Sequence, residues 1–228
     1  TGPATCPPRR GRGQRESGIR GRDRLRAGDI NGVRTVLATW WTVAHRSATG
    51  RQVTDEEVHP FLPAGSRTVL PGDHLDLGLD NLVGPVEHPA EVLFVDDEWE
   101  ATGGVYRDLA AMRTCWKLAT AVVSGGTRHP WPTSTTVDKM AAKFYDLLPD
   151  VTGDPSIDHL HVAEAALRVE AIGGDIATHV AQLRAVGRRS VADRTVGDGH
   201  RSALRRRLAT LKRLPGGELL ATLVRRLR

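Results

Sequence analysis

The chain has 228 residues, of which 39% are hydrophobic and 26% charged, a balance typical of a folded protein with a real core. It contains no run of about 18 or more apolar residues and no apolar segment typical of a signal peptide, so we expect neither a membrane span nor secretion. The two cysteines, at positions 6 and 115, indicate neither a disulfide framework nor a zinc site, and a reducing cytoplasm is the simplest location.

The net charge of +5 conceals opposite charges in different parts of the chain. Residues 1–26 carry eight arginines against two acids, and residues 184–228 carry 13 basic residues against three acids. The middle therefore has 11 basic and 22 acidic residues, a net charge of −11. Neither basic end has an aromatic residue to stack on bases, which argues against nucleic acid as a partner. A weak contact of the basic C-terminus with a membrane surface stays open.

Composition divides the chain into three parts. Residues 1–26 are rich in Arg, Gly and Pro, and such a segment cannot bury enough surface to offset the entropy of ordering, so we expect a disordered tail. Residues 27–190 carry apolar residues with helical and strand periods, which predicts a single α+β domain. Residues 191–228 predict a basic helical C-terminal extension.

The first half of the predicted domain combines one long helix with short strands. Apolar residues at 30–44 recur at spacings of three and four after an N-cap at Asp29, and we expect Trp40 and Trp41 to pack in the core. Residues 54–57 have the pattern of a capping box. We expect strands at 67–70 and 91–95, a short strand or turn at 79–83, and a hairpin that joins the last two.

The second half is predicted to be helical. A helix begins after Gly103-Gly104 and stops at Gly125-Gly126, and Ser134 or Thr135 caps the next one. We expect these helices at 105–123, 137–148, 156–173, 175–186, 201–211 and 218–227. The predicted fold class is therefore α+β, with a small β-sheet or hairpin core at about 67–96 and a predominantly helical C-terminal half.

The most acidic stretch of the chain holds the candidate chemistry. It reads His74-x-Asp76-x-x-x-x-Asn81, followed by an apolar run that ends in Asp96 and Asp97. This order resembles the catalytic segment of the kinase-like phosphotransferases of the aminoglycoside and choline kinase type. The resemblance implies that Asp76 is a catalytic base and that Asn81 with Asp96 or Asp97 binds magnesium for phosphoryl transfer from ATP.

Two parts of such an enzyme are missing from the sequence. A kinase needs a basic residue on an upstream strand to hold the phosphates, and the first lysine of this chain is Lys117. No Gly-rich strand-turn-strand precedes His74 either. Asp and Asn also cap turns and helices, so the same residues have a purely structural interpretation.

A second pattern covers more of the chain. Asp76 and Asn81 precede the apolar strand, and Asp96, Glu98 and Trp99 follow it. Arg113 lies in the next predicted helix. This pattern resembles a segment of large bacterial proteins that combine a methyltransferase domain dependent on S-adenosylmethionine with glycosyltransferase domains for surface glycans. The loop at 129–132 and the helix start at 136–138 are similar to actinobacterial members.

This second resemblance implies an accessory or C-terminal module that acts with an upstream methyltransferase or glycosyltransferase domain in glycan modification. No strand is followed by the Gly-rich turn that a Rossmann methyltransferase needs, so we expect no complete active site and no cofactor in this chain. Magnesium and ATP are expected only under the phosphotransferase alternative. A third hypothesis is a non-enzymatic binding or scaffold domain whose carboxylates are structural.

One histidine pair is a further candidate for a metal site. His159 and His161 are two residues apart on a predicted helix, which places them on different faces, unlike the i, i+4 spacing of helical metal ligands. We therefore expect both side chains at the surface.

Overall fold

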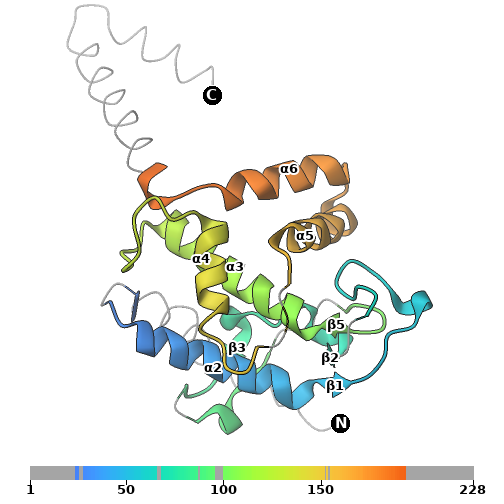
Figure 1. The fold of residues 1–228 in the computed structure, drawn as a ribbon. Helices are drawn as coiled ribbons and strands as arrows, with labels where there is room; N and C mark the ends of the chain where they lie inside the picture. Colours follow the sequence, from blue (N-terminus) through green and yellow to red (C-terminus); the bar gives the residue numbers. More distant parts are fainter. Residues whose placement is uncertain are drawn as a thin grey trace, which may run out of the picture.

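The computed structural model describes residues 24–25, 28–65, 68–86, 88–95, 100–151, 153 and 155–193. Nearly all of the expected tail, the extension beyond residue 193, and residues 96–99 lie outside this part, so the predictions made for them stay predictions. The described part is a mixed α+β structure with small antiparallel sheets in its N-terminal part and a mostly helical C-terminal half (Figure 1). The predicted fold class is confirmed.

The first long helix, α2, spans Ile30–Ser47. It begins where the side chain of Asp29 accepts a hydrogen bond from the backbone N–H of Gly32 at 2.7 Å, as the N-cap prediction required. Trp40 is fully buried, and its indole N–H donates to the carbonyl oxygen of Leu77 at 2.9 Å. This bond fixes α2 to the acidic stretch, and it confirms the predicted core position of the tryptophan.

Two antiparallel sheets follow α2. One has the strand order β1-β2-β5 and the other pairs β3 with β4, and their bounds are β1 Thr49–Gly50, β2 Thr68–Leu70, β3 Leu82–Val83, β4 Leu93–Phe94 and β5 Val105–Tyr106. The second sheet is the predicted hairpin. Short 3₁₀ helices connect the strands: η2 Asp55–Glu57, η3 Gly72–Asp76, η4 Leu79–Asn81 and η5 Pro89–Glu91. The predicted capping box of η2 is present, with reciprocal bonds between Thr54 and Glu57.

The strand expected at 91–95 is reduced to the two residues of β4. The preceding η5 starts with Pro89, and the backbone N–H of Val92 donates to the carbonyl oxygen of Pro89 at 3.3 Å. Proline favours the first position of a helical turn because its φ angle is already fixed there. The start of the apolar run therefore closes a turn instead of extending the strand.

Val105 and Tyr106 form β5, although helical spacing placed them at the start of a helix. They pair with Leu70 and Val69 of β2. Gly104 has a φ of +103°, and a Cβ at this position would lie 2.4 Å from the carbonyl oxygen of Leu70, so only glycine allows the chain to pass this close to β2. Because these two residues pair with a distant strand, the helix begins only at Arg107. Helical spacing in the local sequence cannot indicate such a pairing.

Four helices make up the second half: α3 Arg107–Gly125, α4 Val137–Tyr145, α5 Ile157–Ile172 and α6 Ile176–Gly187. In Figure 1, α3 lies in the middle of the molecule with α2 on one side and α6 on the other, and it contacts α2, α4 and α5. No helix of the described part is long and apolar enough to cross a membrane.

The ends of these helices follow the predicted signals with one correction. Gly126 adopts a left-handed conformation with φ 60° and ends α3, while Ser156 and Asp175 cap α5 and α6. The cap of α4 is Thr136, whose side chain accepts from the N–H of Lys139, so the expected caps at 134 or 135 were wrong. α4 also ends at residue 145 and not 148.

Candidate functional site

The acidic stretch places Asp76 at the end of η3, against the face of α3. Its carboxylate accepts a hydrogen bond from Arg113 at 2.8 Å, pairs with the ammonium group of Lys117, and accepts from the side-chain amide of Asn81 at 3.2 Å. The same amide also donates to the backbone carbonyl of Asp76 at 2.9 Å. Three residues of the predicted motif, Asp76, Asn81 and Arg113, are thus brought together.

Arg113 is the centre of this arrangement. It is 7% exposed, and its guanidinium group also bonds to the carboxylate of Glu164 on α5 and to the carbonyl oxygen of Leu75. The group lies 5.6 Å from the centre of the Phe61 ring. We call Asp76, Asn81, Arg113, Lys117 and Glu164 the Asp76 cluster. Its ion pairs and hydrogen bonds connect η3, η4, α3 and α5, so the cluster holds these four elements together.

The charges of the cluster decide what Asp76 can do. Burial by itself raises the pKa of Asp76, but Lys117 and Arg113 outweigh this effect and hold it below its ordinary value. Asp76 is therefore ionised and each of its oxygens has a donor within the protein. A carboxylate with a low pKa and two cationic partners is a weak general base.

The metal-binding part of the phosphotransferase hypothesis concerns residues that the structure leaves undescribed. Asp96, Asp97, Glu98 and Trp99 lie outside the described residues, so their roles stay predictions. Within the described part, no group of three or more His, Cys, Asp or Glu side chains is arranged to hold a metal ion. Asn81 directs its amide nitrogen to Asp76.

Sequence reasoning missed Lys117 and Glu164. Lys117 lies four residues after Arg113, on the same face of α3, and this spacing is a signal that identifies it once Arg113 is chosen. Glu164 comes 51 residues after Arg113 and pairs with it only because α5 packs on α3. No local pattern indicates that pair.

Asp76 makes the stability of the folded state sensitive to acid. Because the pKa of Asp76 is lower in the folded than in the unfolded chain, its stabilisation is complete above the ordinary value of 3.8 and is lost as the pH falls below it. We expect Asp76→Asn to cost about 1–3 kcal/mol at neutral pH and progressively less below about pH 4. Urea unfolding at several pH values measures this; a difference that does not change with pH would contradict it.

A second buried polar cluster lies at the start of α3. Arg107 and Asp108 are buried and paired at 2.9 Å, and the hydroxyl of Tyr106 donates to Asp108 at 3.0 Å. The Arg107 guanidinium lies 4.4 Å from the centre of the Trp41 ring. Burial, with Asp108 nearby, raises the pKa of Tyr106 to about 12. These contacts fix the start of α3 to α2 and β5, which is a structural role.

The expectation that His161 is at the surface was wrong. Its side chain is 2% exposed, its Nε2 atom lies 3.5 Å from the carboxylate of Asp138, and its ring is 5.7 Å from that of Trp116. The indole N–H of Trp116 donates to the same Asp138 oxygen at 2.9 Å. The His161 side chain therefore faces Trp116 of α3 and Asp138 of α4, whereas Val162 beside it is exposed.

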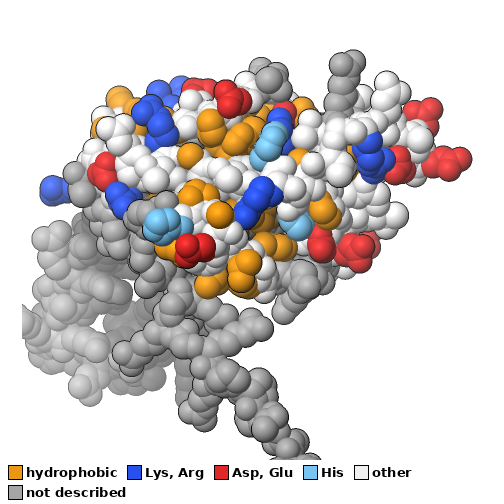
Figure 2. Space-filling model, turned by 90° about the horizontal axis from the view of Figure 1, so that it is seen from below, with side chains coloured by type: hydrophobic (Ala, Val, Ile, Leu, Met, Phe, Trp, Pro, Cys, Tyr) orange, Lys and Arg blue, Asp and Glu red, His pale blue; other side chains and the backbone are white. Residues whose placement is uncertain are grey.

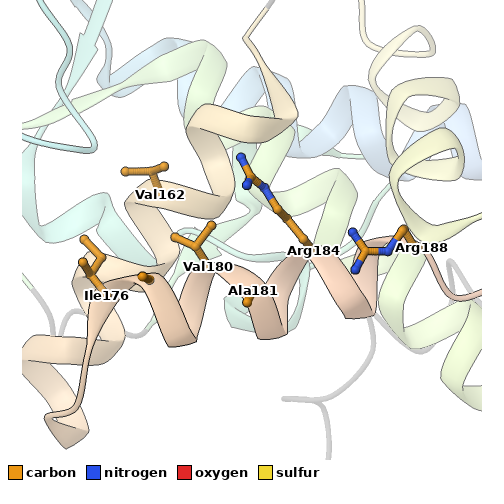
Figure 3. A pocket seen from close by; sticks show the side chains of 7 residues that line it. Val162, Ile176, Val180, Ala181, Arg184 and Arg188 are labelled. Carbon is orange, nitrogen blue, oxygen red and sulfur yellow. The ribbon is translucent and has the colours of Figure 1, made fainter.

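A shallow groove lies between α5 and α6. It has a volume of about 460 Å³, and we call it the α5–α6 groove. Figure 3 shows the side chains that line it, which are Val162, Ile176, Ala177, Val180, Ala181, Arg184 and Arg188. Val162 is 40% and Ile176 44% exposed. The sequence did not predict this site, because apolar residues at helical spacing are ordinarily assigned to the core.

The side of the molecule that faces away from α6 has a different character. Figure 2 shows this side from below, and where side chains are coloured, its apolar groups are interrupted by Lys, Arg, Asp, Glu and His. Charges of both signs are interspersed there, a distribution typical of an ordinary solvated surface.

No protein-family model, curated protein or solved structure matches this chain. The two family resemblances therefore rest on the sequence motifs alone, and the geometry of the described residues carries the functional argument.

Proposed function

We propose that this chain is a non-enzymatic binding module that docks a helical segment of a partner protein in the α5–α6 groove. The observation that carries the proposal is the exposed apolar lining of the groove. Val162 on α5 and Ile176 on α6 lie around Val180 (Figure 3), and both are more than one-third exposed. Exposed apolar side chains that lie together in this way are removed from water when a partner covers them, which favours binding.

The shape of the groove favours a helix as its occupant. Two packed helices present parallel rows of side chains with a furrow between them, and a third helix fits this furrow by placing its own i, i+4 row into it. Ala177 and Ala181 are small, so the backbone of the occupant can approach α6 closely. An extended strand would find no open sheet edge at this position, because both walls are helices.

The Asp76 cluster supports binding rather than catalysis. A general base needs room beside its carboxylate for the hydroxyl that it deprotonates, whereas Asp76 is occupied by Arg113, Lys117 and Asn81. Lys117, the first lysine of the chain, is engaged in this pair. The cluster connects α3 to α5 through Glu164, so its contribution to binding is to hold α5, one wall of the groove, in place.

A docking module also fits the accessory role that the methyltransferase and glycosyltransferase resemblance implies. In a multidomain protein, such a module would recruit a partner without chemistry of its own. Docking in the α5–α6 groove does not depend on the identity of any upstream domain.

The test is a selection of peptides on the full chain. A displayed library of helical peptides of about 18 residues, or five turns, is selected against the folded protein, and the affinity of recovered peptides is measured by fluorescence anisotropy. Ile176→Glu should weaken binding by about tenfold or more, because a carboxylate then occupies the apolar wall. The control is Val58→Glu, since Val58 is 43% exposed and lies outside the groove.

Two results would overturn the proposal. Recovered peptides that bind Ile176→Glu as tightly as the wild-type chain would show that the groove is not the docking surface. Magnesium-dependent ATP binding that is measured by calorimetry and lost in Asp76→Ala would favour the phosphotransferase alternative instead.

A further inference from the structure

The α5–α6 groove has opposite chemical character at its two ends. Ile176, Val180, Arg184 and Arg188 follow one another at intervals of four residues along α6 and its C-terminal cap, and so form one ridge. Figure 3 shows Ile176 and Val180 with Val162 at one end of the groove, and the two arginines at the other. A wholly apolar occupant would leave both guanidinium groups facing a surface that offers no charge.

We propose that the occupant of the groove is an acidic amphipathic helix that runs antiparallel to α6, with carboxylates in its first turn and apolar residues in the turns that follow. This inference rests on the proposed function and specifies the partner of the same site. The carboxylates would meet Arg184 and Arg188, and the apolar residues would meet Val162, Ile176 and Val180.

Both arginines are available to such a partner. Arg188 is exposed and has no ion pair among the described residues. Arg184 pairs with Asp158 at 2.9 Å, but the two side chains are 48% and 73% exposed, and a pair this open to water contributes little to stability. Arg184 can therefore exchange Asp158 for a carboxylate of the partner at little cost.

The antiparallel orientation follows from the charges at helix ends. Acidic residues stabilise the first turn of a helix, because the N-terminal end of the helix dipole is positive. A partner whose acidic first turn lies beside Arg184 and Arg188, at the C-terminal end of α6, has its own axis opposed to that of α6. The same carboxylates then serve both the partner's helix and the two arginines.

A second copy of this chain fits the groove less well. An antiparallel pair of α6 helices would place the apolar half of each, Ile176 and Val180, against the arginines of the other. Four arginines would then face two Asp175 side chains, the caps at the start of each α6. A parallel pair would place like charges side by side. Charge complementarity therefore favours an acidic partner.

Three synthetic peptides of about five helical turns test the inference. The first has three Glu residues in its first turn followed by Leu residues at i, i+4 spacing, the second replaces Glu with Lys, and the third has the Glu residues in its last turn. Fluorescence anisotropy with the full chain should give about tenfold tighter binding for the first peptide than for the other two. This preference should shrink at high ionic strength, because salt screens exposed charges.

Charge reversal in the protein supplies the matched variant. Arg188→Glu should reduce the preference for the Glu peptide over the Lys peptide by about fivefold or more. Arg34→Glu makes the same change in net charge at an exposed position on α2, and it should leave the preference unaltered. Equal effects of the two variants would overturn the inference, because only the net charge of the protein would then matter.

The remaining outcomes separate this inference from the proposed function. Equal binding of all three peptides, weakened by Ile176→Glu, would keep the groove as the docking site and overturn the acidic partner. If none of the three peptides bound, while the peptide library still yielded ligands sensitive to Ile176→Glu, the groove would likewise remain the docking site and the acidic partner would be overturned. Sedimentation velocity that shows the chain forming a dimer, which Ile176→Glu dissociates, would overturn the inference in favour of a second copy.

Discussion

Arg113→Met is expected to lower the free energy of unfolding by about 3–5 kcal/mol, the cost of removing one partner from a buried ion pair. Methionine keeps much of the volume of the arginine side chain but none of its charge. Glu164, whose side chain is 12% exposed, would lose its ion pair, and the carbonyl oxygen of Leu75 would lose a donor. Urea unfolding followed by tryptophan fluorescence measures the effect.

Two further variants make this prediction specific. Arg184→Met removes the exposed pair with Asp158 and should cost less than about 1 kcal/mol. The double variant Arg113→Met with Glu164→Met should recover at least half of the loss, because no unpaired carboxylate then remains beside α3. If Arg113→Met lowered the free energy of unfolding no more than Arg184→Met does, the Asp76 cluster would not hold the four elements together as proposed.

Trp40→Ala is expected to cost about 3–5 kcal/mol, the range for removing a large aromatic side chain from a packed core. Trp40 has no exposed surface, and it connects α2 to the carbonyl oxygen of Leu77 next to η3. The substitution therefore leaves a cavity and removes one of the two donors to this oxygen, the other being the Thr114 hydroxyl at 3.1 Å. Urea unfolding followed by far-ultraviolet circular dichroism measures the change.

Trp40→Phe separates the two parts of this effect. Phenylalanine fills most of the volume but cannot donate to Leu77, and because Thr114 still donates to that oxygen, this variant should cost about 0.5–1.5 kcal/mol. Ile172→Ala is the control, because Ile172 is 76% exposed, and it should change the stability by less than about 0.5 kcal/mol. If Trp40→Ala were as mild as the control, α2 would not be packed on the acidic stretch as the structure has it.

The local features of the fold were largely predictable. The N-cap at Asp29, the capping box at 54–57 and the end of α3 at Gly126 each depend on residues within one helical turn of one another. The hairpin of β3 and β4 was predicted from two apolar runs that flank the turn-forming residues between 84 and 90. β5 was missed because its partner, β2, is more than 30 residues away in the sequence.

The candidate site was predictable only in part. The structure brings together Asp76, Asn81 and Arg113 of the second pattern. The phosphotransferase pattern suggested a catalytic role for Asp76, whose carboxylate lies in ion pairs with Arg113 and Lys117. The pairing with Glu164 depends on how α5 lies against α3. The exposure of Val162 and Ile176 likewise depends on which helix faces are left uncovered.

The sequence by itself determined the α+β class, most helix ends and the hairpin, because periodicity and capping act between residues close along the chain. Only the tertiary structure decided which charges are buried together and which apolar faces stay open. His161 and Val162 are neighbours on α5, yet one is buried and the other exposed. Their difference comes from the direction in which α5 packs on α3 and α4, a property of contacts between distant segments that no local pattern encodes.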